Sequence, residues 1–544
     1  MGAALLSSDD IERLPCGWAR FSDIRQSGMI YVDKTSLVHQ LAVSKVPYFL
    51  SRPRRFGKSL LLSTFESLFS KGLEDFHGLA IENLWHEDRT YPVVHLTFAN
   101  YKLTNAASFE SSMRADLSRQ FGVFMAASPY DVAGHPKAPS DFFLELLSAC
   151  DTASIVLLID EYDAPIAHTL DKPRLNEQIT EILRAFFNVL KDFTGRCRFT
   201  FITGVTRIAH VSLFSEFNNL KELTLSRKLS TLIGFTEDEL HRYFHPYVEN
   251  AAAVLDMTVE DVYSRLKTRY DGYRFTLEVG GQTLYNPWSV LSFLSQPEDG
   301  FDNYWYQSGA GTPKLLIEHL KRNAVNLDYA AMEHDRPTVD KDRLISKSEA
   351  LNIPEDLLLW QTGYYTLKPV SSQRAALVFP NEEVEASVLK LIEDINHLRL
   401  TDETTTKLDN LPELIDALDL KSIQELFNDV LNECLTSDTK VFNYEPDIRN
   451  ILYMKIPEKA LTKLREHNTL HGESDLELKT HKTHLVIEFK RTYEDRDVDA
   501  SLQEGIKQIK TKEYGKGTSP LTLVRVVMVC STCDRKIVLT HRVD

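Results

Sequence analysis

Two groups of residues, far apart in the chain, have the types and spacing that phosphate chemistry needs. The first group contains Gly57-Lys58-Ser59, which follows an apolar run at 46–50 and precedes a helical run at 60–69. Backbone N–H groups at such a helix start can cradle phosphate oxygens, while Lys58 reaches the β and γ phosphates and the Ser59 hydroxyl ligates Mg²⁺. These residues predict a phosphate loop (P-loop) that binds ATP and Mg²⁺.

A near-continuous apolar run further along the chain ends in two carboxylates, Asp160 and Glu161, which is a Walker B pattern. Asp160 would hold Mg²⁺ through water, and Glu161 would orient or deprotonate the attacking water. Another apolar run leads to Thr203 and Arg207, where a polar residue could sense the γ phosphate. The order of these segments predicts one nucleotide site.

The P-loop differs from the G-x4-G-K-S/T template at one position, because Arg52 stands where the template has glycine. Arg54 and Arg55 could replace the missing glycine's backbone donors or steady transition-state charge, or they could be ordinary surface charges. The alternative for the whole group is that Lys58 is a solvated helix cap and that the two carboxylates only end a strand.

The second group consists of Asp475, Glu488 and Lys490, on two alternating segments at 472–479 and 484–490. Alternation is typical of half-buried strands, and a four-residue loop would place Asp475 directly across from Glu488. Like charges about 5 Å apart are destabilising unless a cation lies between them. Mg²⁺ held by Asp475 and Glu488 would ligate a phosphodiester oxygen, while Lys490 would steer or activate the attacking water.

The same register divides this hairpin into two faces, one for the core and one for chemistry or solvent, although an exposed hairpin laced with ion pairs would also alternate. The helix that follows carries Gln508 and a local basic surface of the kind that nucleic-acid binding needs. Gly505 interrupts that helix at a cost of roughly 1 kcal/mol relative to Ala, for no reason visible in the sequence. The apolar face would hold Leu476, Leu478, Leu485, Ile487 and Phe489, the other face Asp475, Glu477, Glu488 and Lys490, and the basic surface Lys507, Lys510 and Lys512.

The first group of residues requires a mostly parallel sheet. Strand-like runs at 46–50, 91–98, 154–159 and 198–202 alternate with helical runs, and a ligand of such a sheet lies at the carboxyl ends of the strands. The predicted fold class is therefore α/β, a P-loop NTPase sheet to which a helical subdomain is attached.

A chain of 544 residues is too long for one hydrophobic core. We predict a P-loop domain at 1–234, a helical, aromatic-rich subdomain at 235–395 that serves as a lid or docking surface, a helical linker at 396–440 and a hairpin domain at 441–544. In the linker, Ser422 and Glu425 have the spacing of a capping box. The linker helix would bury an apolar stripe of Ile423, Leu426, Phe427, Val430 and Leu431.

The segment Ser51-Arg52-Pro53-Arg54-Arg55-Phe56-Gly57-Lys58-Ser59 resembles the Walker A variant of the AAA-ATPase-like family, which is often fused to a C-terminal PD-(D/E)XK nuclease domain. The resemblance implies a P-loop NTPase in which Arg52 is a shared departure from the template. Matching blocks run from about residue 12 to 395 and include Tyr31-Val32-Asp33-Lys34-Thr35, Tyr270-Asp271-Gly272-Tyr273-Arg274-Phe275, Tyr285-Asn286-Pro287-Trp288-Ser289, Gln361-Thr362-Gly363-Tyr364 and Phe379-Pro380-Asn381-Glu382-Glu383.

The spacing Asp475-x12-Glu488-x-Lys490 is that of the PD-(D/E)XK nuclease core, and Gln508 matches a glutamine that the family places beside its site. The resemblance implies a C-terminal α/β domain, similar to restriction endonucleases, that hydrolyses DNA or RNA with Mg²⁺. The sequence departs from the family at Glu473, where an arginine commonly precedes the aspartate by two positions. An extra carboxylate there could become a metal ligand or could spoil the metal's charge balance.

Composition narrows the classes of function and partner. A formal net charge of −16 means that any nucleic-acid contact must be local. Six cysteines give no disulfide framework, and Cys530-x-x-Cys533 lacks two further zinc ligands nearby. The sequence has no secretory signal and no apolar run approaching about 18 residues, so we expect a soluble, intracellular protein without a membrane partner. The choice between cytoplasm and nucleus stays open, as does the choice between a monomer and a homo-oligomer.

Three hypotheses follow from these residues and the resemblance. In the first, an ATP-binding P-loop unit couples its nucleotide state to a Mg²⁺-dependent nuclease that cleaves DNA or RNA. In the second, the protein is a nucleotide-dependent binding switch, and an inactive nuclease fold recognises nucleic acid or a protein partner. In the third, the aromatic middle region is a scaffold that holds partners without nucleotide.

Overall fold

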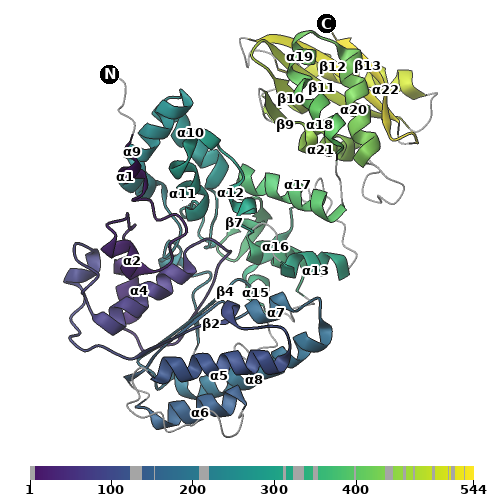
Figure 1. Cartoon of the computed structure of the whole chain (residues 1–544). Coiled ribbons are helices and arrows are strands. Elements are labelled where there is room, and N and C mark those ends of the chain that lie inside the picture. The colour runs from purple at the N-terminus through teal and green to yellow at the C-terminus, as the bar shows by residue number, and fades with distance from the viewer. Residues whose placement is uncertain are drawn as a thin grey trace. The chain divides into compact units, whose positions relative to one another are not determined.

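The computed structural model describes residues 6–122, 138–151, 154–207, 220–309, 314–322, 336–346, 353–396, 400–434, 445–457, 461–469, 472–492, 497–512, 514–515, 521–531 and 533–543. The chain divides into two compact units (Figure 1). The first unit contains Met1–Val325 and Arg336–Ser387, and the second contains Asn326–Asp335 and Val388–Asp544.

A parallel sheet in the strand order β2-β3-β4-β1-β5 forms the centre of the first unit, which confirms the predicted α/β fold. Strands β1, β3 and β4 are buried along their whole length because helices cover both faces. Figure 1 shows α2 and α4 on one side of the sheet and α5, α6 and α8 on the other. The elements are α1 (Ser8–Ile11), α2 (Phe21–Gln26), α3 (Thr35–Ala42), β1 (Tyr48–Ser51), α4 (Lys58–Lys71), β2 (Val93–Thr97), α5 (Ala106–Gly122), α6 (Pro139–Ala149), β3 (Val156–Asp160), α7 (Ala164–His168), α8 (Pro173–Thr194), β4 (Phe199–Gly204) and β5 (Lys221–Glu222).

The aromatic-rich region that follows β5 contains helices and a small antiparallel sheet in the order β6-β8-β7. Its helical core also takes in Leu14 and Val32 from the start of the chain, which pack with Leu240 and Phe244 of α9. The N-terminal segment and this region therefore share one core. The elements are α9 (Glu237–Leu255), α10 (Val259–Tyr270), α11 (Pro287–Ser295), α12 (Tyr304–Gln307), α13 (Lys314–Arg322), β6 (Thr338–Asp340), α15 (Lys341–Leu344), α16 (Glu355–Thr362), β7 (Thr366–Ser371), β8 (Arg374–Val378) and α17 (Glu382–Asn396).

Several sequence blocks that matched the family meet around the buried carboxylate of Glu383. Its oxygens accept hydrogen bonds from the Ser289 hydroxyl at 2.7 Å and from the Trp305 backbone N–H at 2.8 Å. Asn381 Nδ2 donates to the Asp271 carbonyl oxygen at 2.6 Å. Burial raises the pKa of Glu383 to about 7. These blocks connect elements inside the first unit, so their polar residues have a structural role.

The second unit is built on a mixed sheet in the order β13-β12-β11-β10-β9, which confirms the predicted C-terminal α/β fold. The hairpin register is also confirmed, since the pairs run from Leu476 with Ile487 to Lys479 with His484. The elements are α18 (Asp402–Asp409), α19 (Leu411–Asp416), α20 (Leu420–Cys434), α21 (Glu445–Lys455), β9 (Thr462–Thr469), β10 (Gly472–Lys479), β11 (Thr483–Thr492), α22 (Val498–Lys512), β12 (Thr522–Ser531) and β13 (Lys536–Val543).

The predicted apolar face of the hairpin packs into the main core of this unit. The other face is not open to solvent, because Val486 and Val527 pack against Leu502 and Ile509 of α22 and form a second core. Glu477, expected on a face for chemistry or solvent, is completely buried. It accepts hydrogen bonds from Ser474 Oγ at 2.7 Å and pairs with His484 Nε2 at 2.8 Å. The predicted alternation of the hairpin is confirmed, but the sequence did not predict that α22 covers its second face.

Helices α18–α20 contribute to the main core of the second unit, and the predicted apolar stripe of α20 is confirmed as part of it. The predicted capping box is wrong. Helix α20 begins at Leu420, and the carboxylate of Asp419 accepts hydrogen bonds from the Ser422 N–H and hydroxyl at 3.1 and 2.7 Å. An aspartate three residues earlier satisfies the first-turn donors and so takes the capping role from Ser422.

The structure explains Gly505. A Cβ atom at this position would lie 2.6 Å from Val527 Cγ1 and 3.1 Å from Lys490 Cγ. Glycine lets α22 approach the sheet closely at the strand that carries Lys490, and this packing offsets its poor helix propensity.

Across the ranges that the structure describes, no helix combines the length and apolar character needed to cross a membrane.

Candidate functional site

The P-loop joins β1 to α4, and its side chains meet the ends of two other strands. Gly57, the N-cap of α4, has φ of 91°, in the left-handed region that glycine adopts without strain. Lys58 is buried, and its Nζ donates to the carbonyl oxygens of Arg52 and Pro53, both at 2.9 Å. Burial lowers the pKa of Lys58, while the neighbouring Asp160 and Glu161 oppose this shift. An ammonium held by loop carbonyls is placed to exchange them for phosphate oxygens.

Asp160 lies at the carboxyl end of β3, where neighbouring parallel strands bring polar groups together. Ser59 Oγ donates to Asp160 Oδ2 at 2.5 Å, and Thr203 Oγ1, from the end of β4, donates to Asp160 Oδ1. Three predicted site residues therefore converge in the structure. A serine hydroxyl beside a carboxylate is an oxygen donor set that fits Mg²⁺.

Glu161 follows directly and has φ of 51°, which is uncommon for a residue other than glycine. Burial raises the pKa of its carboxyl group, with the Asp160 charge as the second cause. Glu161 lines a cavity of about 440 Å³ together with Arg54, Lys58 and Ser59. A carboxyl group with a raised pKa at the edge of such a cavity is suited to proton transfer.

Arg52 is not among the residues that line this cavity. Its side chain is buried, and Nη1 donates to the carbonyl oxygens of Ser51 at 2.9 Å and Thr224 at 2.7 Å. The guanidinium lies 4.0 Å from the ring centre of Phe275, and burial lowers its pKa to about 9. Phe56 packs edge-on against Tyr273 and Phe275, at centroid distances of 4.7 and 5.3 Å. Arg52 and Phe56 thus fasten the loop to the aromatic-rich region.

Arg54 and Arg55 lie in the expected neighbourhood. Arg54 lines the cavity beside Glu161, and the charges of the two side chains interact. Arg55 has φ of 69°, donates from Nη2 to the Ser308 carbonyl oxygen at 2.9 Å and stacks its guanidinium over Trp288 at 4.3 Å. Of the two arginines, Arg54 is the better placed for phosphate.

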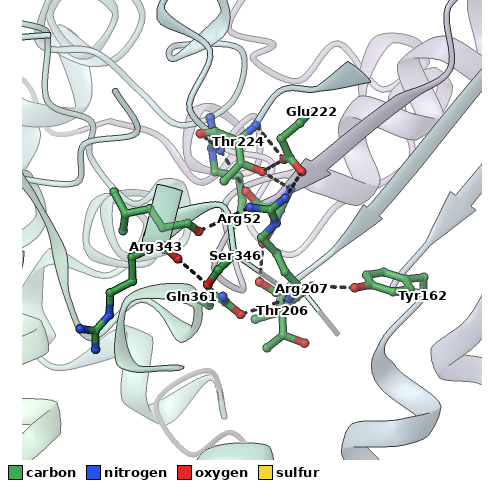
Figure 2. Close-up of polar contacts among 12 residues, drawn as sticks. Arg52, Tyr162, Thr206, Arg207, Glu222, Thr224, Arg343, Ser346 and Gln361 are labelled. Atoms are coloured by element: carbon green, nitrogen blue, oxygen red, sulfur yellow. Dashed lines mark hydrogen bonds and ion pairs between the residues drawn. The ribbon is translucent and has the colours of Figure 1, made fainter. Parts of the chain in front are cut away.

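Arg207 lies elsewhere. Figure 2 shows it in a polar network with the half-buried Glu222 and the buried Thr224, to which Arg52 also belongs. Arg207 Nη2 pairs with Glu222 at 2.7 Å, and the Arg207 backbone N–H donates to Gln361 Oε1 at 3.1 Å. Arg207, which follows β4, therefore links to β5 through its side chain and to α16 through its backbone N–H. Of this predicted pair, the structure brings only Thr203 to Asp160.

The C-terminal group also comes together, and each carboxylate has a cation beside it. Asp475 Oδ2 accepts the Phe489 backbone N–H at 2.7 Å, so Asp475 reaches across to β11. Lys490 Nζ lies 2.8 Å from Glu488 Oε1, and only 2% of the Glu488 side chain is exposed. Arg449 of α21 pairs with Asp475 at 3.3 Å and is itself buried. The arrangement gathers two carboxylates and two cations on adjacent strands and one helix.

The sequence analysis missed Arg449, which lies 26 residues before Asp475. A basic residue inside a helix that otherwise buries Ile448, Ile451 and Leu452 was a signal that could have identified it. Glu473 lies in β10, but its side chain is outside the described part of the chain.

Tyr514 is a second residue that was missed. Its hydroxyl accepts a hydrogen bond from Gln508 Nε2 at 3.1 Å, and the ring is buried in the core beneath α22. Burial raises the pKa of Tyr514, and the nearby charges of Glu488, Asp475 and Lys490 also act on it. Gln508 is therefore connected to the carboxylate group through Tyr514. A buried tyrosine needs a polar partner, so an aromatic residue just after a helix that carries Gln508 was the available signal.

Among the described residues, no three His, Cys, Asp or Glu side chains gather in a cluster that could hold a metal. Two carboxylates still suit Mg²⁺, which proteins commonly bind through one or two carboxylates while the ion keeps several waters. Cys530 is buried in β12, whereas Cys533 is exposed in the turn after it.

Comparison with known proteins agrees with the geometry. A family model described as "Predicted AAA-ATPase" matches residues 15–214, and a model described as "PD-(D/E)XK nuclease superfamily" matches residues 444–540. A protein of Azotobacter chroococcum mcd 1, described as "Uncharacterized protein in vnfD 5'region", is 30% identical over 494 residues, covering 88% of this chain and 89% of the relative. The chain belongs to the AAA-ATPase-like family with a C-terminal PD-(D/E)XK nuclease superfamily domain. In this family member, the P-loop lies within the first match and the carboxylate hairpin within the second.

Proposed function

We propose that this AAA-ATPase-like protein binds and hydrolyses ATP at the P-loop and couples its nucleotide state to a Mg²⁺-dependent nuclease that hydrolyses phosphodiesters of DNA or RNA. The observation that carries the proposal is the convergence of Ser59, Thr203 and Asp160 beside the buried Lys58. Phosphoryl transfer needs a cation for the transferred phosphate, oxygen ligands for Mg²⁺ and a group to orient water, and this cluster supplies the first two.

At the first site, Lys58 would leave the loop carbonyls and bind the β and γ phosphates. Ser59 and Asp160 would hold Mg²⁺, whose chemistry is to neutralise charge on the phosphates. Glu161 would accept the proton of the attacking water, and its raised pKa favours that role near neutral pH. Arg54, beside Glu161, would bind the outer phosphate oxygens. Thr203 would hold the Asp160 carboxylate in place through its hydrogen bond.

At the second site, Asp475 and Glu488 would hold Mg²⁺, which supplies a Lewis acid for the phosphodiester oxygen. Lys490 would orient the attacking water, and Gln508 with Tyr514 would support the substrate side of the site. The exposed lysines of α22 give the acidic chain a local surface for a nucleic-acid backbone. They are Lys507, Lys510 and Lys512.

The deciding experiment incubates the purified full chain with Mg²⁺ and plasmid, single-stranded DNA or RNA, each with and without ATP. We expect cleavage of at least one substrate by the wild-type protein, and loss of cleavage in Glu488→Ala. Glu425→Ala, which removes a carboxylate whose side chain is 66% exposed, is the matched control. Undiminished cleavage by Glu488→Ala, or no cleavage by the wild type, would contradict the nuclease half of the proposal.

One observation favours the binding switch as a second candidate. Asp475 and Glu488 already have Arg449 and Lys490 at 3.3 and 2.8 Å, so the carboxylate pair is charge-balanced without a metal. A domain of this kind would bind nucleic acid in a salt-sensitive way without releasing products. Retained binding by a protein that gives no cleavage under any metal condition would select this candidate.

A further inference from the structure

Glu161 has a backbone conformation that its residue type does not favour. Its φ of 51° lies in the left-handed region, which residues other than glycine rarely adopt. Such a conformation persists only where the surrounding structure fixes it, and it is common at functional sites. The contacts that fix the turn around Glu161 therefore decide where its carboxylate points.

Packing of the Glu161 side chain does not supply this restraint. The residue borders the cavity of about 440 Å³ that contains Lys58, and it also borders a second cavity of about 40 Å³. The second cavity is lined by Asp163 and Thr206 as well. A side chain with space on two sides has few neighbouring atoms to hold it. The position of the Glu161 carboxylate therefore depends on the backbone that carries it.

Asp163, two residues after Glu161, restrains this backbone. Its buried carboxylate accepts hydrogen bonds from the Thr206 backbone N–H at 2.7 Å and from the Thr206 hydroxyl at 2.6 Å. The Val205 backbone nitrogen lies 3.3 and 3.2 Å from its two oxygens. Hydrogen bonds to an ionised carboxylate are stronger than those between neutral groups. Asp163 thus joins the turn that carries Glu161 to the segment that follows β4.

Tyr162 joins the same two segments. Its backbone N–H donates to the Thr203 carbonyl oxygen at 3.1 Å, and its hydroxyl donates to the Thr206 carbonyl oxygen at 2.9 Å (Figure 2). The segments approach closely because Gly204 has no side chain. A Cβ atom there would lie 2.5 Å from the Tyr162 ring and 2.9 Å from Asp163 Oδ1. The close contact leaves the turn little freedom to move away from β4.

We propose that Asp163 is a positioning residue for ATP hydrolysis. By joining its turn to Val205 and Thr206, it holds Glu161 in the left-handed conformation, with the carboxylate at the edge of the large cavity. The inference rests on the proposed function, in which Glu161 accepts the proton of the attacking water.

A residue that acts through Glu161 should affect the rate of hydrolysis and not the binding of nucleotide. The phosphate-binding groups of the proposed function include Lys58 and Ser59, which lie on α4. Asp163 is absent from the described residues that line the large cavity. Its loss should therefore leave the phosphate-binding side of the site in place.

The test measures kcat for ATP hydrolysis and the calorimetric dissociation constant of ADP, both on the full chain in Mg²⁺. Asp163→Ala removes every acceptor oxygen of the carboxylate, and kcat should fall about a hundredfold, because a displacement of about 1 Å has an effect of that size. The dissociation constant should change by less than about threefold, since no phosphate-binding group is removed. Asp163→Asn keeps one acceptor oxygen and should retain kcat within about tenfold. Asp88→Ala, at an exposed carboxylate, is the control variant.

A double variant separates positioning from a general structural role. If Asp163 acts through Glu161, adding Asp163→Ala to Glu161→Gln should slow hydrolysis by less than about a further threefold. Losses that multiply in the double variant, or a wild-type kcat in Asp163→Ala, would overturn the positioning role and leave the ATPase proposal intact. ADP binding that weakens in Asp163→Ala as much as kcat falls would overturn it in the same way.

Failure of the proposed function would look different. No ATP hydrolysis by the wild type, or an undiminished rate in Glu161→Gln, would contradict the role of Glu161 itself. The positioning role of Asp163 would then fall with it.

Discussion

The two candidate sites differ in how they neutralise their carboxylates. In the part of the chain that the structure describes, Asp160 accepts hydrogen bonds from two neutral hydroxyls, those of Ser59 and Thr203. Asp475 and Glu488 instead each have a cation close by, Arg449 and Lys490. Neutral donors orient a carboxylate and leave its charge for an incoming ion, whereas a built-in cation balances that charge in advance.

The difference suggests different responses to ligand at the two sites. In the proposed function, Mg²⁺ and phosphate would complete the electrostatics of the first, where the Lys58 ammonium is held nearby on loop carbonyls. At the second, a metal would have to share Asp475 with Arg449 or displace the arginine, so metal affinity would depend on how firmly that arginine is held. Five experiments test this contrast between the two sites.

The largest effect is expected from Lys58→Ala. Removing the ammonium takes away the charge that would meet the β and γ phosphates, so steady-state ATP hydrolysis should fall by roughly a hundredfold or more. Lys45→Ala, at an exposed lysine just before β1, should have no effect. Hydrolysis by Lys58→Ala at the wild-type rate would show that the Lys58 ammonium does not act on the phosphates of ATP.

Glu488→Gln keeps the shape of the side chain and removes its charge. Cleavage of nucleic acid should fall by about a hundredfold while the ATPase rate in the absence of nucleic acid stays unchanged, because in the proposed function only the second site would lose a metal ligand. Both rates are measured on the same preparation, with Glu425→Gln as the control. Retained cleavage would mean that Glu488 pairs with Lys490 but has no part in the cleavage reaction.

Arg449→Met leaves Asp475 without its cation. Because Arg449 is buried, breaking the pair should lower the free energy of unfolding by about 3 kcal/mol without metal, measured by chemical denaturation of the second unit's transition. Added Mn²⁺ should then stabilise the variant more than it stabilises the wild type. The same denaturation midpoint for variant and wild type, with and without Mn²⁺, would remove the distinction between the sites.

Gly505→Ala tests how tightly α22 is packed on the second site. In an exposed helix this change stabilises by about 1 kcal/mol, but here the new methyl group meets Val527 and the Lys490 stem. We expect destabilisation of about 1–3 kcal/mol and weaker cleavage. An increase in the unfolding free energy would show that the helix can move away from the sheet without loss.

The smallest effect is the pH dependence of the first site. Because burial and Asp160 raise the pKa of Glu161, its carboxylate form is lost on acidification at a higher pH than the usual 4.5 of glutamate. ATPase activity, measured as kcat, should therefore begin to fall on acidification at a higher pH than an unshifted glutamate would give. Glu161→Gln should abolish this limb, and an identical limb in the variant would assign it to another group.

Local patterns predicted the framework well. Apolar runs of strand length gave the strands of the parallel sheet, and alternation gave the register of β10 and β11. These features depend on residues near one another in sequence, or on one short loop, so spacing alone determines them. The convergence of Asp160, Thr203 and Ser59 followed because the carboxyl ends of adjacent parallel strands must meet.

Side-chain partners across the fold could not be predicted in the same way. The position of Arg52 in the P-loop template does not predict that its side chain is buried against Phe275. That burial depends on how a loop distant in sequence packs. Arg449 meets Asp475 only because α21 lies over the sheet, and periodicity contains no such information. The sequence did not predict that α22 covers the second face of the hairpin. An alternating pattern is the same whether the polar residues face water or are buried against another element.

The attachment of Phe56 to Tyr273 and Phe275 sets a lower limit on the length of a fragment that keeps the P-loop supported. The matched segment ends at residue 214, yet two rings from beyond that boundary hold the apolar residue next to Gly57. A shortened protein that stops there would present Phe56 to water and release the strand-to-helix turn from its support. The smallest useful fragment of the first unit therefore extends past Phe275.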